Sequence, residues 1–111
     1  MALLATQETT LAGLNPVYSS VSASDTFVPD DRTYVHVKNG GGSPDTVAIV
    51  TPVTYRGQAV ADAGGSVTNA QERMIGPFPA NFFADPVTGL ATIAHSFTTS
   101  VTSGVFKLGQ P

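Results

Sequence analysis

Short stretches rich in β-branched residues, each ended by glycine or proline, run through the whole chain and constrain its fold more than any other feature. Val, Ile and Thr suit a pleated, half-buried surface, whereas Gly and Pro end strands and form tight turns. No window keeps a helical period of apolar residues for three turns, so crossover helices are not expected and the strands must pair antiparallel. The pattern predicts an all-β fold, a small antiparallel β-sandwich of jelly-roll or immunoglobulin-like type with about seven to nine short strands.

Two pairs of neighbouring strands are predicted to form hairpins. Residues 33–38 alternate between apolar and polar side chains, residues 46–51 are apolar on both faces, and the glycine-rich stretch 39–45 joins them. Residues 90–97 and 101–108 have similar length and lie close together in the chain. This second pair is expected to close the domain.

The beginning of the chain does not share this pattern. Residues 1–24 have no clean period and end in a run of small side chains, which predicts an N-terminal arm and linker, with residues 25–111 as the β-sandwich domain. The leucines of the arm are expected to lie either on the body of the domain or on a neighbouring molecule. Such an arm is a candidate to become ordered on a binding partner.

Phe78 stands between two prolines and has two interpretations. The six phenylalanines can dominate a core of this size, and Phe78 could be one of its members. Alternatively, a loop braced by prolines can hold an exposed side chain in place for a partner at low entropic cost. The candidates for a protein interface are Leu3, Leu4, Leu11, Leu14, Tyr18 and Phe78.

The chain carries unusually few charges. Charged residues make up 12% of it, about half of the usual share of roughly 25%. An uncharged surface is easier to desolvate against a partner than a surface rich in Lys and Glu. The net charge is -3 with only five Lys and Arg, so a nucleic-acid partner is not expected. The first residues lack the basic start of a signal peptide and no stretch resembles a membrane span, so we expect folding in a cytoplasm and no membrane partner.

Little in the sequence points to catalysis or metal binding. His36 and His95 lack the ligand spacing of a zinc site, and His95 is expected at a buried edge or an interface. Asp30 and Asp31 leave room for a weak calcium site, although the alternating ligands of a calcium loop are absent. The glycines at 40–42 join two strands instead of opening a helix, which argues against a phosphate cradle. With no cysteine and no nucleophile beside a base, we expect no enzyme activity, no catalytic residues, no metal and no cofactor.

Several pieces of the chain, taken in order, resemble the short head decoration or minor capsid proteins of siphovirus-type tailed bacteriophages that infect actinobacteria. These pieces are structural and not chemical, and the most distinctive is the stretch 76–79. They are TLAGL (10–14) with Pro16 and Tyr18, FVPDD (27–31), YVHVKNG (34–40), VAIVTP (47–52), ERMIGPFP (72–79) and VFKL (105–108).

The resemblance implies a β-sandwich carried on the outer surface of an assembled phage head. It implies the major capsid protein as a partner, further copies of the same chain as a second partner, and a location on the virion after assembly in the host cytoplasm. It offers no catalytic residues. A capsid decoration protein would stabilise the shell by binding its assembled form, as any ligand of a native state does.

Three alternatives stay open at this point. A head–tail connector or tail component is the first, although ring-forming parts usually have a helix or long loops for contact between subunits. A carbohydrate- or cell-surface-binding module is the second; it would need solvent-facing aromatic side chains, and the chain has three tyrosines and no tryptophan. A small hydrolase is the third and has the least support in the sequence.

Overall fold

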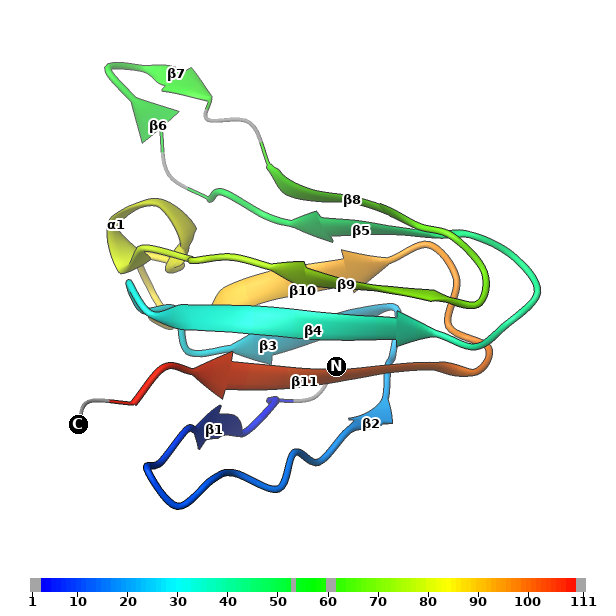
Figure 1. Cartoon of the computed structure of the whole chain (residues 1–111). Helices are drawn as coiled ribbons and strands as arrows, with labels where there is room; N and C mark the ends of the chain where they lie inside the picture. Colours follow the sequence, from blue (N-terminus) through cyan, green and yellow to red (C-terminus); the bar gives the residue numbers. More distant parts are fainter. Residues whose placement is uncertain (1–2, 53, 60–61, 110–111) are drawn as a thin grey trace.

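The computed structural model describes residues 3–52, 54–59 and 62–109, and it contains two β-sheets stacked face to face (Figure 1). The first sheet has the order β1 (Thr6–Glu8), β11 (Val101–Lys107), β4 (Thr33–Asn39) and β9 (Gln71–Ile75), and β2 (Ser19–Ser20) also pairs with β11. The second sheet has the order β3 (Ser24–Phe27), β10 (Ala91–His95), β5 (Asp45–Ile49) and β8 (Ala63–Val67). The strands β6 (Thr54–Tyr55) and β7 (Gln58–Ala59) form a separate hairpin, and α1 (Ala80–Phe83) is a single helical turn. The predicted all-β sandwich is confirmed.

The topology is that of a jelly roll. With β2 taken as the edge strand, the two sheets run β2-β11-β4-β9 and β3-β10-β5-β8. Among these eight strands nearly every connection crosses from one sheet to the other. Only β5 and β8 follow each other within one sheet, with the β6–β7 hairpin between them. All pairs of these eight strands are antiparallel, as in two interleaved Greek keys.

Both predicted hairpins are wrong, because the strands of each pair belong to different sheets. β4 pairs with β11 and β9, whereas β5 pairs with β10 and β8. β10 and β11 are likewise in opposite sheets. Neighbouring strands lie about 5 Å apart and stacked sheets about 10 Å apart, and the short loops after β4 and β10 can span either distance. The length of the loop therefore could not distinguish a hairpin from a crossing between sheets.

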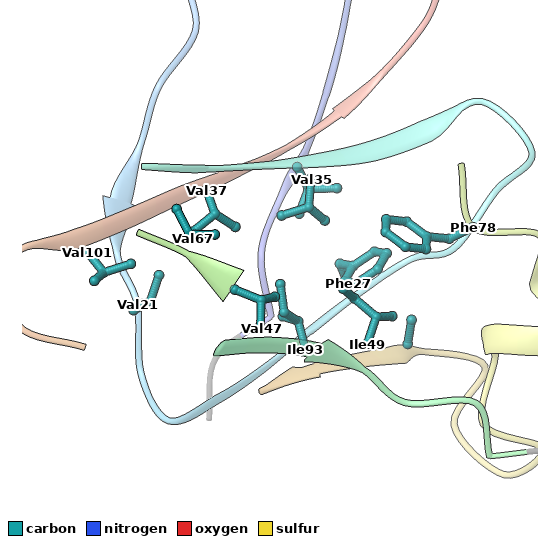
Figure 2. Packing of buried hydrophobic residues seen from close by; sticks show 12 residues of the cluster. Val21, Phe27, Val35, Val37, Val47, Ile49, Val67, Phe78, Ile93 and Val101 are labelled. Carbon is teal, nitrogen blue, oxygen red and sulfur yellow. The ribbon is translucent and has the colours of Figure 1, made fainter. Parts of the chain in front are cut away.

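The core lies between the sheets and is built mainly from alternate residues of their strands. In β4 the buried and half-buried positions alternate without exception, and Val35 and Val37 point inward. Figure 2 shows these valines facing Val47 and Ile93 of the second sheet. Val21 also belongs to the core, although it precedes β3.

Phe78 is a member of this core. Its side chain is fully buried and packs on Phe27 (Figure 2), and its ring lies 5.2 Å from the rings of both Phe27 and Phe83. The backbone bridge between Phe78 and Asp30 turns the proline-flanked loop inward. The expectation that Phe78 is an exposed docking anchor is therefore wrong, since the loop holds the ring against other aromatic side chains of the same molecule.

The predicted N-terminal arm lies on the body of its own domain. β1 pairs in parallel with the end of β11, and β2 pairs antiparallel with its beginning (Figure 1). Leu3 forms a bridge with Thr26 of β3, and Leu4 packs against the core. The boundary predicted at residue 24 therefore does not separate two structural units. We call residues 3–20 the N-terminal segment.

Candidate protein-binding surface

The N-terminal segment is fastened at the base of a loop, residues 9–16. The side-chain amide of Gln7 makes two hydrogen bonds of 2.8 Å with Val17, donating to its carbonyl and accepting from its N–H. The Thr9 N–H donates to the Lys107 carbonyl at 3.0 Å, and its hydroxyl accepts from Gly109 N–H at 2.7 Å. Both ends of the loop are thus held while the loop itself projects from the sheet edge.

A second set of contacts holds the segment on the outer face of the first sheet. Tyr34 and His36 of β4 point to this face, and so does Phe106 of β11. Phe106 is only 4% exposed because Tyr18 and Tyr34 cover it, with ring distances of 5.6 and 5.7 Å. We call Tyr18, Tyr34, His36 and Phe106 the outer-face cluster. It forms a small hydrophobic layer outside the main core.

A chain of hydrogen bonds crosses the outer-face cluster. The Tyr18 hydroxyl lies 2.7 Å from His36 Nδ1, and His36 Nε2 lies 2.9 Å from a Glu72 carboxylate oxygen. A carboxylate only accepts, so in the neutral imidazole Nε2 carries the hydrogen and Nδ1 accepts from the phenol. Burial raises the pKa of the Tyr18 phenol above its usual value of 10.0, and the negative charge of Glu72 and the neighbouring Tyr34 add to this. At neutral pH Tyr18 is therefore a hydrogen-bond donor and not a phenolate nucleophile.

The outer-face cluster and the 9–16 loop enclose a pocket of about 340 Å³. Leu14 and Pro16 form its wall on the side of the loop, while Tyr34 and Met74 line it on the side of the sheet. The amine of Lys38 lies 3.9 Å from the centre of the Tyr18 ring, on the same face. The pocket is small and aromatic, and the Lys38 amine and the Glu72 carboxylate lie beside it. This composition suits a side chain or a small ring.

Three apolar side chains of the N-terminal segment remain in solvent. Leu11, at the loop, is 91% exposed, and Leu3 and Val17 are exposed by 61% and 66%. Leu14 is half-buried against the pocket, and Leu4 is half-buried against the core. Of the predicted interface residues, the structure gathers Leu11, Leu14 and Tyr18 around one loop. Val17 instead lines a separate hollow of about 310 Å³ together with Leu3 and Leu4. No pattern in the sequence distinguishes Val17 from the other valines of the chain.

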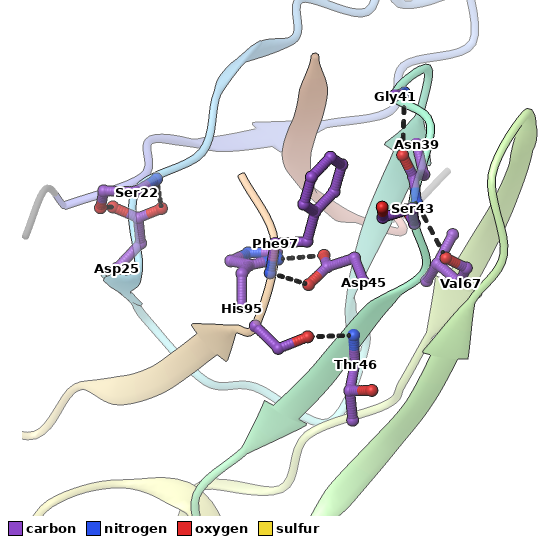
Figure 3. Close-up of polar contacts among 11 residues, drawn as sticks. Ser22, Asp25, Asn39, Gly41, Ser43, Asp45, Thr46, Val67, His95 and Phe97 are labelled. Carbon is purple, nitrogen blue, oxygen red and sulfur yellow. Dashed lines mark hydrogen bonds and ion pairs between the residues drawn. The ribbon is translucent and has the colours of Figure 1, made fainter. Parts of the chain in front are cut away.

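His95 belongs to a buried polar pair and not to an interface. Its Nδ1 lies 2.6 Å from a carboxylate oxygen of Asp45, and both side chains are fully buried (Figure 3). The other oxygen of Asp45 accepts from the Phe97 N–H at 3.2 Å. Within the part of the chain that the structure describes, His95 Nε2 has no hydrogen-bond partner. The sequence placed Asp45 in a turn, whereas it begins β5 and ties β5 to the residues that follow β10.

Asn39 fixes the same end of the sandwich. Its side-chain amide donates to the carbonyls of Ser43 and Val67 at 2.8 and 2.9 Å and accepts from Gly41 N–H at 2.9 Å (Figure 3). Together with the Asp45–His95 pair, these bonds hold the loops that cross between the sheets. Their role is structural, because the side chains of Asn39, Asp45 and His95 are all buried.

Asp30 is engaged within the chain. Its carboxylate accepts from the Arg32 N–H at 3.0 Å and lies 3.5 Å from the Lys107 amine. The bond to Arg32 N–H, followed by the charge of Lys107, lowers the pKa of Asp30 below its usual value, against an opposing effect of burial. Among the described residues no three His, Asp or Glu side chains come together as a metal site would require. Nor does any helix in that part of the chain have the length and apolar character to cross a membrane.

Comparison of the chain with protein-family models, with curated proteins and with solved structures finds no match.

Proposed function

We propose that the chain is a structural virion protein, a decoration protein that binds the outer surface of a tailed-phage head and stabilises it. One structural observation carries the proposal: Leu11 stands 91% exposed on a loop whose two ends are fixed by hydrogen bonds. Holding a large apolar side chain in water has no benefit for the fold. It does favour binding, because a partner that covers Leu11 finds the loop already ordered.

The size and composition of the surface are compatible with this role. The chain exposes 6289 Å². A standard contact takes about 800 Å² from each partner, so one contact with the major capsid protein and one with a second copy of the chain would cover about a quarter of the surface. The low charge of the chain reduces the desolvation cost of such contacts.

The test is binding of the purified protein to capsids assembled without it, counted by cryo-electron microscopy. Near-stoichiometric density on the outer shell, with the 9–16 loop at the contact, supports the proposal. Leu11→Asp should reduce occupancy at least about tenfold, because a buried unpaired carboxylate is costly. Val87→Asp is the matched control, since Val87 is also apolar and is 92% exposed on another loop. Capsids that remain bare with the unchanged protein would refute the proposal.

A head–tail connector of the same phage remains the nearest alternative, and the copy number in purified virions separates the two. Hundreds of copies per virion indicate decoration, whereas the few copies of a single ring indicate a connector. Carbohydrate binding, the second alternative, has one observation in its favour, namely the pocket that Tyr34 and Met74 line beside the outer-face cluster. Binding of the labelled protein to a glycan array, lost in Tyr34→Ala, would move that role ahead.

A further inference from the structure

The side of the sandwich opposite the N-terminal segment is an open groove. β8 and β9 are the last strands of their sheets, and no other described strand pairs with their free edges. Between them lies a hollow of about 450 Å³ lined by Gly64, Gly65 and Ser66 of β8 and by Arg73, Met74 and Ile75 of β9. We call this hollow the edge groove.

The free edges offer unpaired backbone groups. In an antiparallel strand, the N–H and C=O of alternate residues point to opposite sides. The Val50 N–H donates to the Thr92 carbonyl, and the Ser96 N–H donates to the Thr46 carbonyl. The even-numbered residues of β5 therefore make their backbone hydrogen bonds with β10. The odd-numbered residues of β5 make theirs with β8. By register, Gly64 and Ser66 then turn their backbone groups to the free edge of β8.

The same reasoning applies to β9. Gly40 N–H donates to the Ser100 carbonyl, and Leu108 N–H donates to the Arg32 carbonyl. The even-numbered residues of β4 therefore make their backbone hydrogen bonds with β11. The odd-numbered residues of β4 pair with β9, and by register Glu72 and Met74 turn their backbone groups to its free edge. Exposed edges of this kind are templates for an added strand.

The edge groove has free space for a side chain, and Arg73 provides a positive charge at its mouth. Gly65 lies on the inward face of β8, as Val67 does, and a Cβ added there meets nothing within 4 Å. Arg73 lies opposite Val37 and so also faces inward, yet its side chain is exposed at the mouth of the groove. Among the residues that the structure describes, Arg73 has no ion-pair partner. The chain has a net charge of -3, so acidic groups outnumber basic ones, yet none of the described acidic groups pairs with this arginine.

We propose that the edge groove binds an extended acidic segment of a partner protein, which adds a strand to β9 and places a carboxylate against Arg73. The backbone of the segment satisfies the free groups of Glu72 and Met74, and this gives affinity for any extended chain. Arg73 adds selectivity for an acidic side chain on the inward face of the added strand. Gly65 leaves space for that side chain on the opposite wall. The edge groove lies apart from the 9–16 loop, so its occupant can differ from the partner that covers Leu11.

The test uses the full chain labelled with nitrogen-15 and a capped synthetic peptide of alternating valine and glutamate, about eight residues long. Saturable shifts of the amide signals of residues 64–66 and 72–76 are expected. A peptide with lysine in place of glutamate should bind at least about fivefold more weakly, as expected for loss of one ion pair and gain of a like-charge contact. Arg73→Glu should reverse this preference, and Arg56→Glu, with the same change of net charge on the β6–β7 turn, should keep it.

Gly65→Val gives a test that does not depend on charge. A Cβ added at Gly65 meets nothing within 4 Å and the backbone angle is ordinary, so we expect the variant to fold while both peptides lose binding. Absence of amide shifts with either peptide, or equal affinity for the two, would overturn the proposal. A dimer of the protein alone that Gly65→Val dissociates would also overturn it and assign the groove to a second copy. No capsid is needed, so failure here leaves the proposed decoration role untouched.

Discussion

Each long side of the sandwich has strand edges that could pair with another chain, but the two sides differ in how these edges are protected. On one side, β11 and β3 would be the edge strands without the N-terminal segment, which covers both through β1, β2 and the bridge of Leu3 to Thr26. On the other side, β9 and β8 end the sheets without a further strand among the described residues. The first side is closed by pairing and the second is left open, with an inward-facing arginine and two glycines at its mouth.

The difference shows two solutions to the problem of free strand edges. Covering an edge removes its unpaired backbone groups from all partners at once. A charge placed on the inward face instead leaves the groups available but makes pairing selective, because an apolar strand would bury Arg73 without a partner. The closed side can therefore present its apolar residues on a loop that is held at both ends, while the open side, as we propose, accepts only a segment that satisfies its charge.

The largest expected effect tests whether the two sides form one cooperative unit. Phe78 follows β9 on the open side, yet its ring packs on Phe27 of β3 on the closed side. Phe78→Ala should lower the free energy of unfolding by about 4 kcal/mol, the cost of emptying a buried aromatic site. Urea denaturation followed by circular dichroism measures this, with Val87→Ala, a truncation at a 92% exposed site, as the control. A loss below about 1 kcal/mol for Phe78→Ala would mean that the sides are independent.

The sequence predicted single strands well but not how they pair. Strong local alternation is enough to predict β4, and its observed bounds differ from the expected 33–38 by one residue. The partners of each strand were not predictable, since short loops fit both a hairpin and a crossing between sheets. The closed side was missed because β1 is three residues long and pairs with a strand almost a hundred residues later, an arrangement with no local signal.

The candidate binding surface was predicted only in part. Leucines on an aperiodic segment suggested an interface, and the structure places one of them, Leu11, in solvent. The covering of Phe106 by Tyr18 depends on contacts between distant strands, so no local pattern indicates the outer hydrophobic layer. Phe78 shows the opposite case. Its prolines suggested exposure, but the direction of a braced loop is set by the packing around it.

Two adjacent glycines sharpen the comparison on the open side, with the second-largest effect. Gly64 has φ +116°, and a Cβ there would collide with the Val47 carbonyl of β5. Gly64→Ala should therefore cost about 3 kcal/mol of unfolding free energy through backbone strain and steric overlap. Gly65→Ala, which meets open space at an ordinary backbone angle, should be neutral or stabilising by roughly 0.5 kcal/mol. Equal losses in urea denaturation would contradict the difference between Gly64, which is packed against the backbone of β5, and Gly65, which faces the open groove.

Two adjacent leucines do the same on the closed side, with a smaller effect. Leu4 packs against the core and its N–H donates to the Thr26 carbonyl at 2.7 Å, whereas the side chain of Leu3 is 61% exposed. Leu4→Ala should lower the free energy of unfolding by about 2 kcal/mol, and Leu3→Ala by less than about 0.5 kcal/mol. Hydrogen exchange should also speed up along β1 in the Leu4 variant alone. Similar losses for both variants would show that the N-terminal segment is not seated on the core by Leu4.

The smallest effect is a pH dependence that belongs to the closed side. The pKa of Asp30 is lowered in the folded protein by the Arg32 N–H and by Lys107, so folding favours its carboxylate form. The contribution of Asp30 is therefore fully present above the unfolded-state pKa, near 3.8, and it disappears as the pH falls through the lower folded-state value. Asp30→Asn keeps the shape of the side chain but cannot ionise, so it should unfold at lower urea concentration than the unchanged protein at about pH 7 and at nearly the same concentration at about pH 2. Asp31→Asn removes the same charge from the neighbouring exposed position. If it reproduces the pH dependence, the effect arises from net charge and not from the contact that joins the β3–β4 connection to β11.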